Sequence, residues 1–571
     1  MKYTEIYKTW CENANEDNDI INELNDIKND SDAIYERFYT SLKFGTAGLR
    51  GIIGAGTNRM NIYVVRQATQ GLANYIIKKF GGGAVAISHD SRIKASLFMN
   101  EAARVLAANG IKVFITKELE PTPVLSYLVR YFKCQAGIMI TASHNPAEYN
   151  GYKAYGDDGC QLTDNDANAV YDEIQNLDIF NDVKLGDFDC FIKEGKIIYV
   201  DNNVYDEYLK EVKNQQVSPG ICQDSDLSVV YTPLNGTGNK LVRKVLSDIG
   251  VKNVKIVKEQ EMPDGNFTTC PFPNPEIREA LQKGLDLCEI EKPDLLLATD
   301  PDADRVGIAV KDNDGSYRLI TGNETGAMLT QYLLSQRKEL GNLPENPIVV
   351  KTIVTTPLIN AICGEYNCEL IDVLTGFKYI GEVILNLEEK DEEERFVFGF
   401  EESYGYLAGT YVRDKDAVVA SMLICEMAAY YKKQGKTLAN VIDDIYKNYG
   451  FYKNTTLNFY FDGSEGMKKM DNIMSLLRNN SPSDIAGYKV LTIADYLNST
   501  EKDLVTNKNT TINLPKSNVI SYTLEDNHAC IIRPSGTEPK IKLYITAVGK
   551  DEKNAIDITE KIKDNITQYL K

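Results

Sequence analysis

A serine in a polar turn is the first residue whose surroundings could support chemistry. Ser143 follows the short apolar run Ala136–Ile140, whose polar borders and β-branched residues predict a buried strand. Pro146 cannot join a ladder of strands, so the strand must end in an irregular turn. α/β proteins place ligands at such strand ends. The same residues also suit an ordinary turn, and this stretch alone does not decide between a turn and an active site.

A second stretch carries three aspartates at alternating positions, Asp300, Asp302 and Asp304. In an extended loop, side chains at i, i+2 and i+4 point to one side, so these carboxylates can bind a single hard cation. A calcium EF-hand loop needs glycine at its sixth position and glutamate at its twelfth, where this chain has Arg305 and Lys311. The sequence therefore favours Mg²⁺ over Ca²⁺. A solvated turn without a metal is the weaker alternative, because clustered carboxylates repel one another.

Ser143 lacks the partners that acyl-transfer enzymes supply to a serine nucleophile. It does not stand in a G-x-S-x-G elbow, and with His144 as its immediate neighbour a Ser-His-Asp relay is difficult to place. Phosphoryl transfer instead depends mainly on positioning and on neutralising charge. Arg50, Lys153 and Arg305 would provide that charge near a serine that carries a phosphate. Phosphoryl transfer is therefore the chemistry that these residues favour.

Three further loops could bind parts of a phosphorylated substrate. Glycine recurs at every third position in residues 43–51, which lets backbone N–H groups approach an anion. The segment 533–537 offers a guanidinium, two hydroxyls and a glycine, which suits a dianionic phosphate. Glu401 and Ser403 offer an acceptor and a donor to neighbouring hydroxyls, as a sugar presents them. Each loop alone is more often a turn than a site, so only their combination is informative.

The composition excludes several classes of function. The 571 residues carry a net charge of −19, which argues against binding to nucleic acids or anionic membranes. The 11 cysteines form no C-x-x-C pair, and the three histidines leave few ways to build a zinc site. We expect a cytoplasmic protein, because no signal peptide is visible and Glu426 interrupts the most apolar helical stretch.

Alternation of helices and strands predicts an α/β architecture over most of the chain. Residues 1–40 read as a helical extension, and after about residue 450 the pattern changes to that of a smaller α+β domain. We therefore expect three similar α/β domains and one C-terminal α+β domain. The helices predicted in these domains are 62–80, 95–109, 200–214, 464–478 and 552–570. The predicted strands are 84–89, 112–116, 136–140, 226–231, 294–299, 347–352, 370–374, 395–398 and 540–547.

Five motifs in this order resemble those of the α-D-phosphohexomutase family, which contains phosphoglucomutases and phosphomannomutases. They are Phe44–Gly51, Thr141–Pro146, Asp300–Arg305, Gly399–Gly405 and Arg533–Thr537, and together they span nearly the whole chain. The resemblance implies mixed sheets in the α/β domains and four domains around a central cleft. The implied boundaries are 1–215 for the serine domain with its extension, 216–322 for the metal domain, 323–450 for the sugar domain and 451–571 for the phosphate domain.

The resemblance also implies a mechanism and a set of site residues. Ser143 would be phosphorylated in the resting enzyme, and Mg²⁺ would bridge it to the three aspartates. The serine would give its phosphate to one end of a sugar phosphate, and the bisphosphate, glucose 1,6-bisphosphate, would turn over and return the other phosphate. The implied catalytic residues are Ser143, His144, Lys153 and Arg50; the implied metal ligands are Ser143, Asp300, Asp302 and Asp304; the implied substrate contacts are Arg305, Thr375, Gly376, Lys378, Glu401, Ser403, Arg533, Ser535, Gly536 and Thr537.

Two departures from the family pattern bear on the substrate. Pro301 stands where many relatives have glycine, which should stiffen the metal loop without removing a carboxylate. The segment 401–405 resembles glucose-type members, so we expect interconversion of glucose 1-phosphate and glucose 6-phosphate by a monomer or homodimer. Phosphopentomutase or phosphomannomutase activity, a Mg²⁺-dependent sugar phosphatase and a non-catalytic sugar-phosphate-binding protein are the alternatives.

Overall fold

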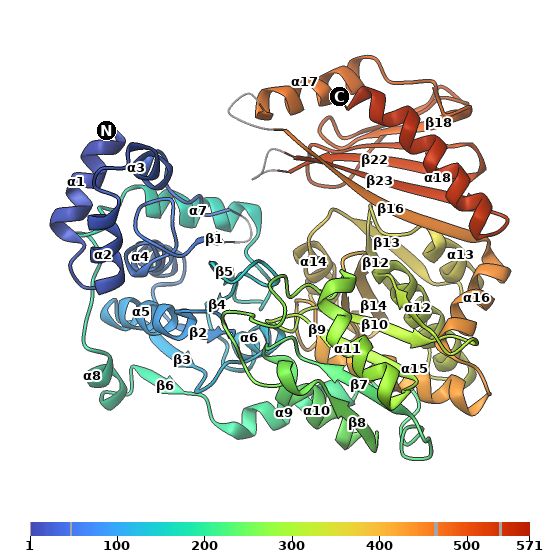
Figure 1. Cartoon of the computed structure of the whole chain (residues 1–571), viewed down its shortest axis with the longest axis horizontal. Coiled ribbons are helices and arrows are strands. Elements are labelled where there is room, and N and C mark those ends of the chain that lie inside the picture. Colours follow the sequence, from blue (N-terminus) through green and yellow to red (C-terminus); the bar gives the residue numbers. More distant parts are fainter. Residues whose placement is uncertain (1, 46–47, 462–465, 536–539, 571) are drawn as a thin grey trace.

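The computed structural model describes residues 2–45, 48–461, 466–535 and 540–570. Within these residues the strands form four sheets that follow one another along the chain, and we call the parts built on them domains I to IV. Domain I lies on the left of Figure 1, domain II below, domain III on the right and domain IV above domain III. Across the described ranges, no helix has the length and apolar character that a membrane crossing needs.

Domain I places a mixed six-stranded sheet between two layers of helices. The strand order is β1-β5-β4-β2-β3-β6, in which β4, β2, β3 and β6 are parallel, and β5 is antiparallel to both of its neighbours, β4 and β1. Its elements are α1 (Tyr3–Asn13), α2 (Asn18–Asp26), α3 (Ser31–Phe38), β1 (Leu49–Ile52), α4 (Ile62–Phe80), β2 (Ala84–His89), α5 (Ala95–Ala108), β3 (Lys112–Ile115), α6 (Thr122–Tyr131), β4 (Ala136–Ile140), β5 (Tyr149–Tyr155), α7 (Asp164–Gln175), α8 (Phe188–Lys193), β6 (Ile197–Tyr199) and α9 (Asn202–Lys213).

Alternation along the buried strands explains why both faces of this sheet are covered. On β4, Ile138 and Ile140 join the core beneath α4 and α5, whereas Met139 between them faces α6 and α9. Residues 1–40 are helical as predicted, and these helices pack onto the first of these cores through Trp10, Ile20 and other apolar side chains. The parallel strands therefore sit between two apolar layers, and their carboxyl ends meet at one edge of the sheet.

Domains II and III repeat this scheme with smaller sheets, of orders β11-β10-β9-β7-β8 and β13-β12-β14-β15. The elements of domain II are β7 (Ser228–Thr232), α10 (Gly238–Asp248), β8 (Asn253–Ile256), α11 (Arg278–Glu291), β9 (Leu295–Thr299), β10 (Val306–Lys311) and β11 (Tyr317–Ile320). Those of domain III are α12 (Gly322–Glu339), β12 (Ile348–Thr352), α13 (Leu358–Glu365), β13 (Glu369–Val373), α14 (Phe377–Glu388), β14 (Phe396–Glu401), β15 (Gly405–Leu407), α15 (Ala417–Lys433) and α16 (Leu438–Tyr449).

One supersecondary unit recurs in all three α/β domains. A strand with a parallel neighbour turns into an antiparallel partner, in the pairs β4–β5, β9–β10 and β14–β15. The connecting segments are the serine loop (141–148), the aspartate loop (300–305) and the glutamate loop (402–404). Each contains a non-glycine residue in the left-handed region, namely Ser143 (φ 52°), Ala303 (φ 50°) and Tyr404 (φ 64°). Three of the loops that the sequence marked for chemistry thus stand on equivalent hairpins, one in each α/β domain.

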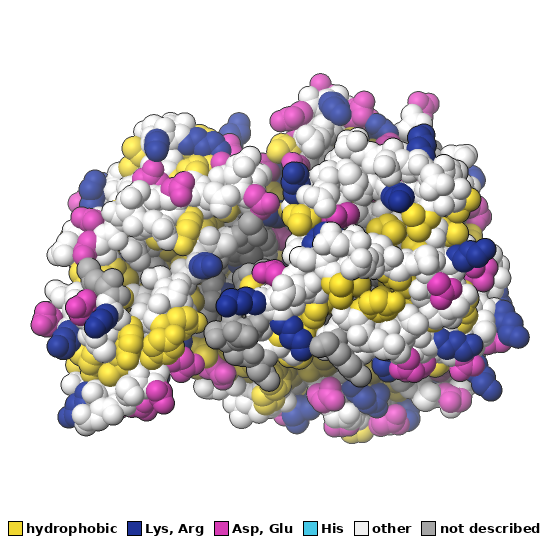
Figure 2. Space-filling view, turned by 90° about the horizontal axis from the view of Figure 1, so that it is seen from above, with side chains coloured by type: hydrophobic (Ala, Val, Ile, Leu, Met, Phe, Trp, Pro, Cys, Tyr) yellow, Lys and Arg dark blue, Asp and Glu magenta, His cyan; other side chains and the backbone are white. Residues whose placement is uncertain are grey.

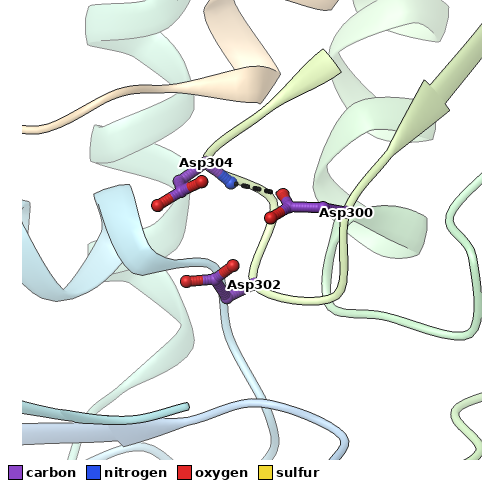
Figure 3. A group of neighbouring side chains, drawn as sticks. All are labelled: Asp300, Asp302 and Asp304. Atoms are coloured by element: carbon purple, nitrogen blue, oxygen red, sulfur yellow. Dashed lines mark hydrogen bonds between the residues drawn. The ribbon is translucent and has the colours of Figure 1, made fainter. Parts of the chain in front are cut away.

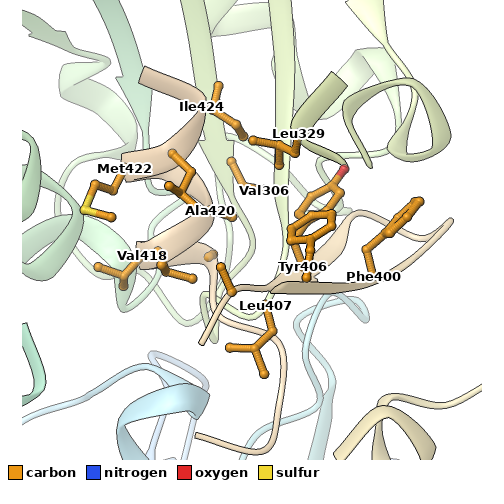
Figure 4. Packing of buried hydrophobic residues seen from close by; sticks show 14 of the residues in the cluster. Val306, Leu329, Phe400, Tyr406, Leu407, Val418, Ala420, Met422 and Ile424 are labelled. Atoms are coloured by element: carbon orange, nitrogen blue, oxygen red, sulfur yellow. The ribbon is translucent and has the colours of Figure 1, made fainter. Parts of the chain in front are cut away.

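Domains II and III share one hydrophobic core. Helix α15 of domain III is buried along almost its whole length and packs against the sheet of domain II (Figure 4). Val306 of β10, Leu329 of α12 and Ile424 of α15 meet there. The buried Glu426 on α15 accepts hydrogen bonds from the Tyr332 hydroxyl and two backbone N–H groups, which makes its burial tolerable. Such a shared core fixes the aspartate loop relative to domain III.

Domain IV is built differently, on an antiparallel sheet covered by α17 and α18. Its strand order is β16-β23-β22-β21-β18-β19-β20, with β17 pairing with β18. Its elements are β16 (Phe451–Tyr460), α17 (Gly466–Asn479), β17 (Asp484–Ile485), β18 (Tyr488–Asp495), β19 (Thr500–Asp503), β20 (Asn509–Thr511), β21 (Ile520–Leu524), β22 (Ala529–Pro534), β23 (Lys540–Gly549) and α18 (Glu552–Ile566). Short 3-10 turns occupy Lys258–Gln260, Glu393–Arg395, Glu525–Asn527 and Thr567–Tyr569.

The predicted fold class is confirmed: three similar α/β domains with mixed sheets precede a smaller C-terminal domain. Seen from above, the molecular surface is hollowed between domain I and the remaining domains (Figure 2). The residue boundaries predicted for the four domains stay predictions.

Candidate functional site

Ser143 lies at the carboxyl end of β4, as its position after the apolar run predicted. Its side chain is buried, and its Oγ donates a hydrogen bond to Asp300 Oδ2 at 3.0 Å across the boundary between domains I and II. The same Oγ lies 3.1 Å from His144 Nδ1. This contact is possible between adjacent residues because Ser143 adopts left-handed backbone angles. The serine thus faces both a carboxylate and an imidazole.

Burial of the His144 ring, together with the nearby Arg305 and Arg50 guanidinium groups, lowers the pKa of His144 well below its ordinary value. The imidazole is therefore neutral at neutral pH, with a ring nitrogen able to accept a proton. Arg50 itself lies at the exposed edge of the site and donates from Nη1 to Asn145 Oδ1 at 3.0 Å.

The three aspartates converge, and Figure 3 shows their carboxylates turned toward one region of space. One oxygen from each lies within 4.8 Å of the others, and all three side chains are buried. The prediction that these aspartates lie in an extended loop is wrong. The loop is a turn in which the N–H groups of Asp304 and Arg305 donate to Asp300 Oδ1 at 3.1 and 3.0 Å, and Ala303 is left-handed. Convergence therefore comes from the turn and not from strand alternation.

Two lysines from other domains neutralise this acidic turn. Lys153 Nζ of β5 donates to Asp302 Oδ2 at 2.7 Å and to Asp304 Oδ2 at 3.2 Å. Lys415 Nζ of domain III lies 3.3 Å from the same Asp304 oxygen and 3.0 Å from Asp414. All these side chains are almost entirely buried, so their interactions are little screened by solvent. Three domains therefore meet at one charged cluster.

The charges within the cluster shift the pKa values in opposite directions. Burial and the neighbouring carboxylates of Asp302 and Asp304 raise the pKa of Asp300 well above its usual range. Burial also opposes ionisation of Asp302, but the Lys153 ammonium outweighs it and lowers the pKa of Asp302. The two carboxylates raise the pKa of Lys153 despite its burial, so this lysine holds its proton.

The aspartate loop fits a divalent cation. Asp302 Oδ1 and Asp304 Oδ1 are buried and have no hydrogen-bond partner within the described residues, which leaves two anionic oxygens unsatisfied beside the Asp300 carboxylate. Hard carboxylate oxygens in this number suit Mg²⁺, which takes a few protein ligands and keeps its other positions for water or phosphate. The buried triad is therefore the candidate metal site of this chain.

The predicted sugar contacts lie beside this cluster on domain III. Glu401 at the end of β14 accepts the N–H of Gly376 at 2.9 Å, and burial raises the pKa of Glu401. Thr375 Oγ1 is buried without a hydrogen-bond partner among the described residues. Ser403 belongs to the glutamate loop, whose Glu402 accepts from the hydroxyls of two threonines. Glu401, Gly376 and Thr375 are therefore brought together by tertiary contacts between β14 and the segment before α14.

Lys378 is paired with a residue of another domain. Its Nζ donates to Asp164 at the start of α7 in domain I. The pair borders a cavity of about 390 Å³ lined from domains I and III and by Pro515 of domain IV. Arg305 likewise forms an ion pair, with Glu276, and its backbone N–H binds Asp300. Both cations thus have carboxylate partners.

The predicted phosphate loop of domain IV is described only in part. Arg533 is the penultimate residue of β22, and the N–H of Ser535 donates to the carbonyl oxygen of Lys540 at 2.8 Å. Gly536 and Thr537 lie outside the described residues. The roles assigned to these four residues, and to the other catalytic and substrate-contact positions, stay predictions.

Sequence reasoning missed several residues that the structure brings to the site. Lys415 stands just before Asp416, the N-cap of α15, so its position follows from where that helix begins. Thr122 Oγ1 of α6 donates to Asp302 Oδ2 at 2.7 Å. Arg92, after β2, is buried behind the serine loop. The ends of parallel strands meet at one edge, so the polar residues 89–92 after β2 were the available signal for Arg92.

Profiles of known families match three consecutive parts of the chain. They are described as phosphoglucomutase/phosphomannomutase alpha/beta/alpha domains I, II and III, and they cover residues 41–179, 206–315 and 321–449. Phosphoglucomutase of Staphylococcus saprophyticus is 38% identical over 556 residues, which span 97% of this chain and 98% of the relative. This chain belongs to the phosphoglucomutase/phosphomannomutase family. Phosphoglucomutase of Staphylococcus aureus strain MSSA476 is 37% identical and covers 97% of both chains.

Solved structures of phosphoglucomutase/phosphomannomutase proteins share the fold. The open form of pp63/parafusin, a phosphoglucomutase from Paramecium, superposes with a TM-score of 0.68 at 18% identity and covers 93% of this chain and 96% of its own. A family member from Burkholderia thailandensis gives a TM-score of 0.67 at 18% identity, covering 92% of this chain and 96% of its own. At these identities the similarity establishes the four-domain fold alone.

Proposed function

We propose that this protein is a phosphoglucomutase, an intramolecular phosphotransferase that interconverts glucose 1-phosphate and glucose 6-phosphate. The observation that carries the proposal is the contact of Ser143 Oγ with Asp300 of the metal-binding turn. A serine beside a Mg²⁺ site suits a phosphate carrier, because phosphoryl transfer requires positioning and neutralisation of charge. The full-length relatives in Staphylococcus are named phosphoglucomutases, which supports the choice of glucose.

Ser143 Oγ would carry the phosphoryl group in the resting enzyme. When this group passes to a hydroxyl of the sugar phosphate, a new O–P bond to the sugar would form as the O–P bond to Ser143 breaks, and the proton lost by the sugar hydroxyl would pass to the serine oxygen by way of His144. Lys153, which holds its proton, would stabilise charge beside the aspartates. Neutral His144, with Nδ1 at 3.1 Å from Oγ, is placed to exchange a proton with the serine.

Asp300, Asp302 and Asp304 would hold Mg²⁺ through their converging oxygens. When bound, Mg²⁺ supplies Lewis-acid neutralisation of the phosphoryl oxygens. The two unpartnered oxygens Asp302 Oδ1 and Asp304 Oδ1 support this assignment. The remaining carboxylate oxygens accept hydrogen bonds from lysine, threonine, serine and backbone donors, which fix the orientation of the carboxylates.

The sugar and its second phosphate would bind the remaining loops. Glu401 and Ser403 would hold the sugar hydroxyls, Thr375, Gly376, Lys378 and Arg305 would line the substrate path, and Arg50 would meet the transferring phosphate. Arg533, Ser535, Gly536 and Thr537 would bind the phosphate that is not reacting. Glucose 1,6-bisphosphate would be the intermediate that turns over between two opposed orientations. We also propose a cytoplasmic location, supported by cysteines that are all free thiols, and a monomer or homodimer as the assembly.

A coupled assay tests the function directly. The protein is incubated with glucose 1-phosphate, Mg²⁺ and a trace of glucose 1,6-bisphosphate, and glucose 6-phosphate is measured. We expect turnover by the native chain, none by Ser143→Ala, and unchanged turnover by Ser335→Ala, whose serine lies on α12 away from the site. Release of free phosphate in place of glucose 6-phosphate would identify a phosphatase and contradict the proposal.

The same assay with other sugar 1-phosphates tests the substrate. We expect the highest kcat/KM with glucose 1-phosphate, and lower values with mannose, glucosamine and ribose 1-phosphates. A higher value with ribose 1-phosphate would change the assignment to a phosphopentomutase while leaving the serine chemistry intact.

A further inference from the structure

A single buried guanidinium holds the serine loop from behind. Arg92 donates from Nη1 to two carbonyl oxygens and from Nη2 to two more, and its side chain is closed to solvent. The four acceptors are the carbonyl oxygens of Pro146 at 2.8 Å, Tyr149 at 2.9 Å, Ser143 at 2.6 Å and Asn145. The loop therefore wraps around one cation with its carbonyl groups pointing inward.

A second chain of hydrogen bonds fixes the other side of the same backbone. The Arg92 N–H donates to Asp90 Oδ1 at 2.9 Å, and the Thr141 hydroxyl donates to Asp90 Oδ2 at 2.5 Å. The Thr141 hydroxyl in turn accepts the N–H of Ser143 at 2.8 Å. Both the N–H and the C=O of Ser143 are thus tied to residues 90–92. This double attachment maintains the left-handed conformation that points Oγ at the aspartate loop.

Domain II covers the face of this guanidinium. The ring of Phe267 is fully buried, and its centroid lies 5.1 Å from Arg92 Cζ. The neighbouring Gly265 approaches so closely that an added Cβ would lie 2.8 Å from Ser91 O and Ile93 N. The turn 264–267 of domain II is therefore seated on the segment 91–93 of domain I, directly behind the serine loop.

This arrangement of carbonyl groups requires the guanidinium of an arginine. Four carbonyl oxygens around one point need donors in several fixed directions, which a planar guanidinium supplies and a lysine ammonium does not. A role in folding alone would be met by any well-packed buried side chain. The contact with the backbone of Ser143 itself, and the aromatic cover from the domain that also carries the aspartates, point to a more specific role.

We propose that Arg92 and Phe267 are positioning residues for Ser143, through which domain II sets the orientation of the serine that domain I contributes. The inference rests on the proposed function, in which Ser143 carries the phosphate. Arg92 acts through the loop carbonyl groups and does not touch the substrate. Phe267 acts one step further away, through the guanidinium.

Three variants test this on the full chain, namely Arg92→Lys, Phe267→Leu and the double variant. We expect Arg92→Lys to lower kcat by roughly 10- to 100-fold with KM within about twofold, because small displacements of a reacting group are costly. Phe267→Leu should lower kcat by about three- to tenfold, again with KM within about twofold of the native value. The loss of kcat in the double variant should be no more than about twice the loss in Arg92→Lys, since both changes act through one guanidinium.

A matched control is available in domain I. Lys196 lies over the ring of Phe191 at the same 5.1 Å, on the far side of the domain from the serine loop. Phe191→Leu should lower the melting temperature to an extent similar to Phe267→Leu, yet leave kcat unchanged. An equal loss of kcat in the control would show that the Phe267 effect is general destabilisation and would overturn the proposal.

Hydrogen exchange separates this inference from the proposed function. In Phe267→Leu, the amides of residues 141–149 should exchange about tenfold faster than in the native protein, and in Phe191→Leu they should not change. That result supports the positioning role even if the native chain does not convert glucose 1-phosphate, which would refute only the proposed function. Native turnover with unchanged exchange and unchanged kcat in both Phe267→Leu and Arg92→Lys would overturn the positioning role.

Discussion

The serine loop and the aspartate loop stand on equivalent hairpins of domains I and II, but different groups of each loop are held by their neighbours. In the serine loop, the Arg92 guanidinium binds backbone carbonyl groups and leaves the Ser143 hydroxyl to bind Asp300. In the aspartate loop, backbone N–H groups bind Asp300, and two lysines from other domains bind the remaining carboxylates. The equivalent hairpins therefore determine the path of the backbone, while neighbouring elements determine the chemistry of each loop.

Burial separates two lysine–aspartate contacts that cross domain boundaries. Lys153 and Asp302 are 6% and 0% exposed, whereas Lys378 and Asp164 are 13% and 50% exposed. Removing one partner of an ion pair that is closed to solvent strongly lowers stability, because the other charge is left buried without a partner. A half-exposed pair contributes little and can open for a competing anion. We therefore expect the buried contact to be essential and the exposed one to be adjustable.

Asp302→Asn should produce the largest effect, because it removes one carboxylate from the metal-binding turn. We expect kcat to fall by roughly 10³-fold and the concentration of Mg²⁺ needed for half-maximal turnover to rise. The measurement is a Mg²⁺ titration of initial rates. Asp314→Asn, in the exposed turn before β11, serves as the control and should behave like the native protein. Native-like turnover of Asp302→Asn would exclude the turn as the metal site.

Lys153→Met comes next, because it removes the buried cation and leaves carboxylates to repel one another. We expect kcat to fall by roughly 10²-fold. Stability should fall by about 3–5 kcal/mol, as when one partner of a buried ion pair is removed. Added Mg²⁺ should restore part of that stability. Kinetics and thermal melts with and without Mg²⁺ check this, with exposed Lys468→Met as the control. If Mg²⁺ had no effect on the melt, the lysine and the metal would not share these carboxylates.

Asp164→Asn should have a small effect on binding and almost none on kcat. Removing the carboxylate frees Lys378 for the substrate phosphate, and a half-exposed pair of this kind is worth about 0.2–1 kcal/mol. KM for glucose 1-phosphate should therefore fall by up to about fivefold. Asp157→Asn, on the exposed preceding loop, is the matched control. A rise in KM would mean that the pair holds Lys378 in its working position and would reverse this interpretation.

Glu120→Gln should leave turnover unchanged and alter only the pH dependence of stability. Burial raises the pKa of Glu120 to about 8, with Glu118 adding to the effect and Lys240 opposing it. Because the folded-state pKa lies above the unfolded value of about 4.3, the carboxyl group is protonated in the folded protein, and stability is lost as pH rises toward 8.

The native protein should therefore lose up to about 1.4 kcal/mol of stability per pH unit between about pH 5 and 8 through this group. Glu120→Gln should remove that slope, and exposed Glu118→Gln should keep it. Chemical denaturation at several pH values measures both. Parallel pH profiles for the native protein and Glu120→Gln would show that Glu120 is not the responsible group.

Local patterns were sufficient to predict some of the helices and strands, among them the strands that carry the serine, aspartate and glutamate loops. The apolar run before Ser143, the run before Asp300 and the run at 395–398 each became a strand that ends at its polar loop. Strand ends could be located because Pro, Gly and charged residues interrupt an apolar run. The shape of the aspartate loop could not, because the left-handed angles of Ala303 and the hydrogen bonds to Asp300 depend on contacts that alternation does not encode.

The sequence by itself determined the residue types that do chemistry and the strand ends that carry them, since both follow from short-range pattern and composition. Only the tertiary structure decided which charges meet. Lys153, Lys415 and Thr122 are far from Asp302 and Asp304 in the chain, yet they bind those carboxylates. Such pairings depend on how separate sheets pack through shared cores, and a linear pattern of residues carries no information about the distance between two domains.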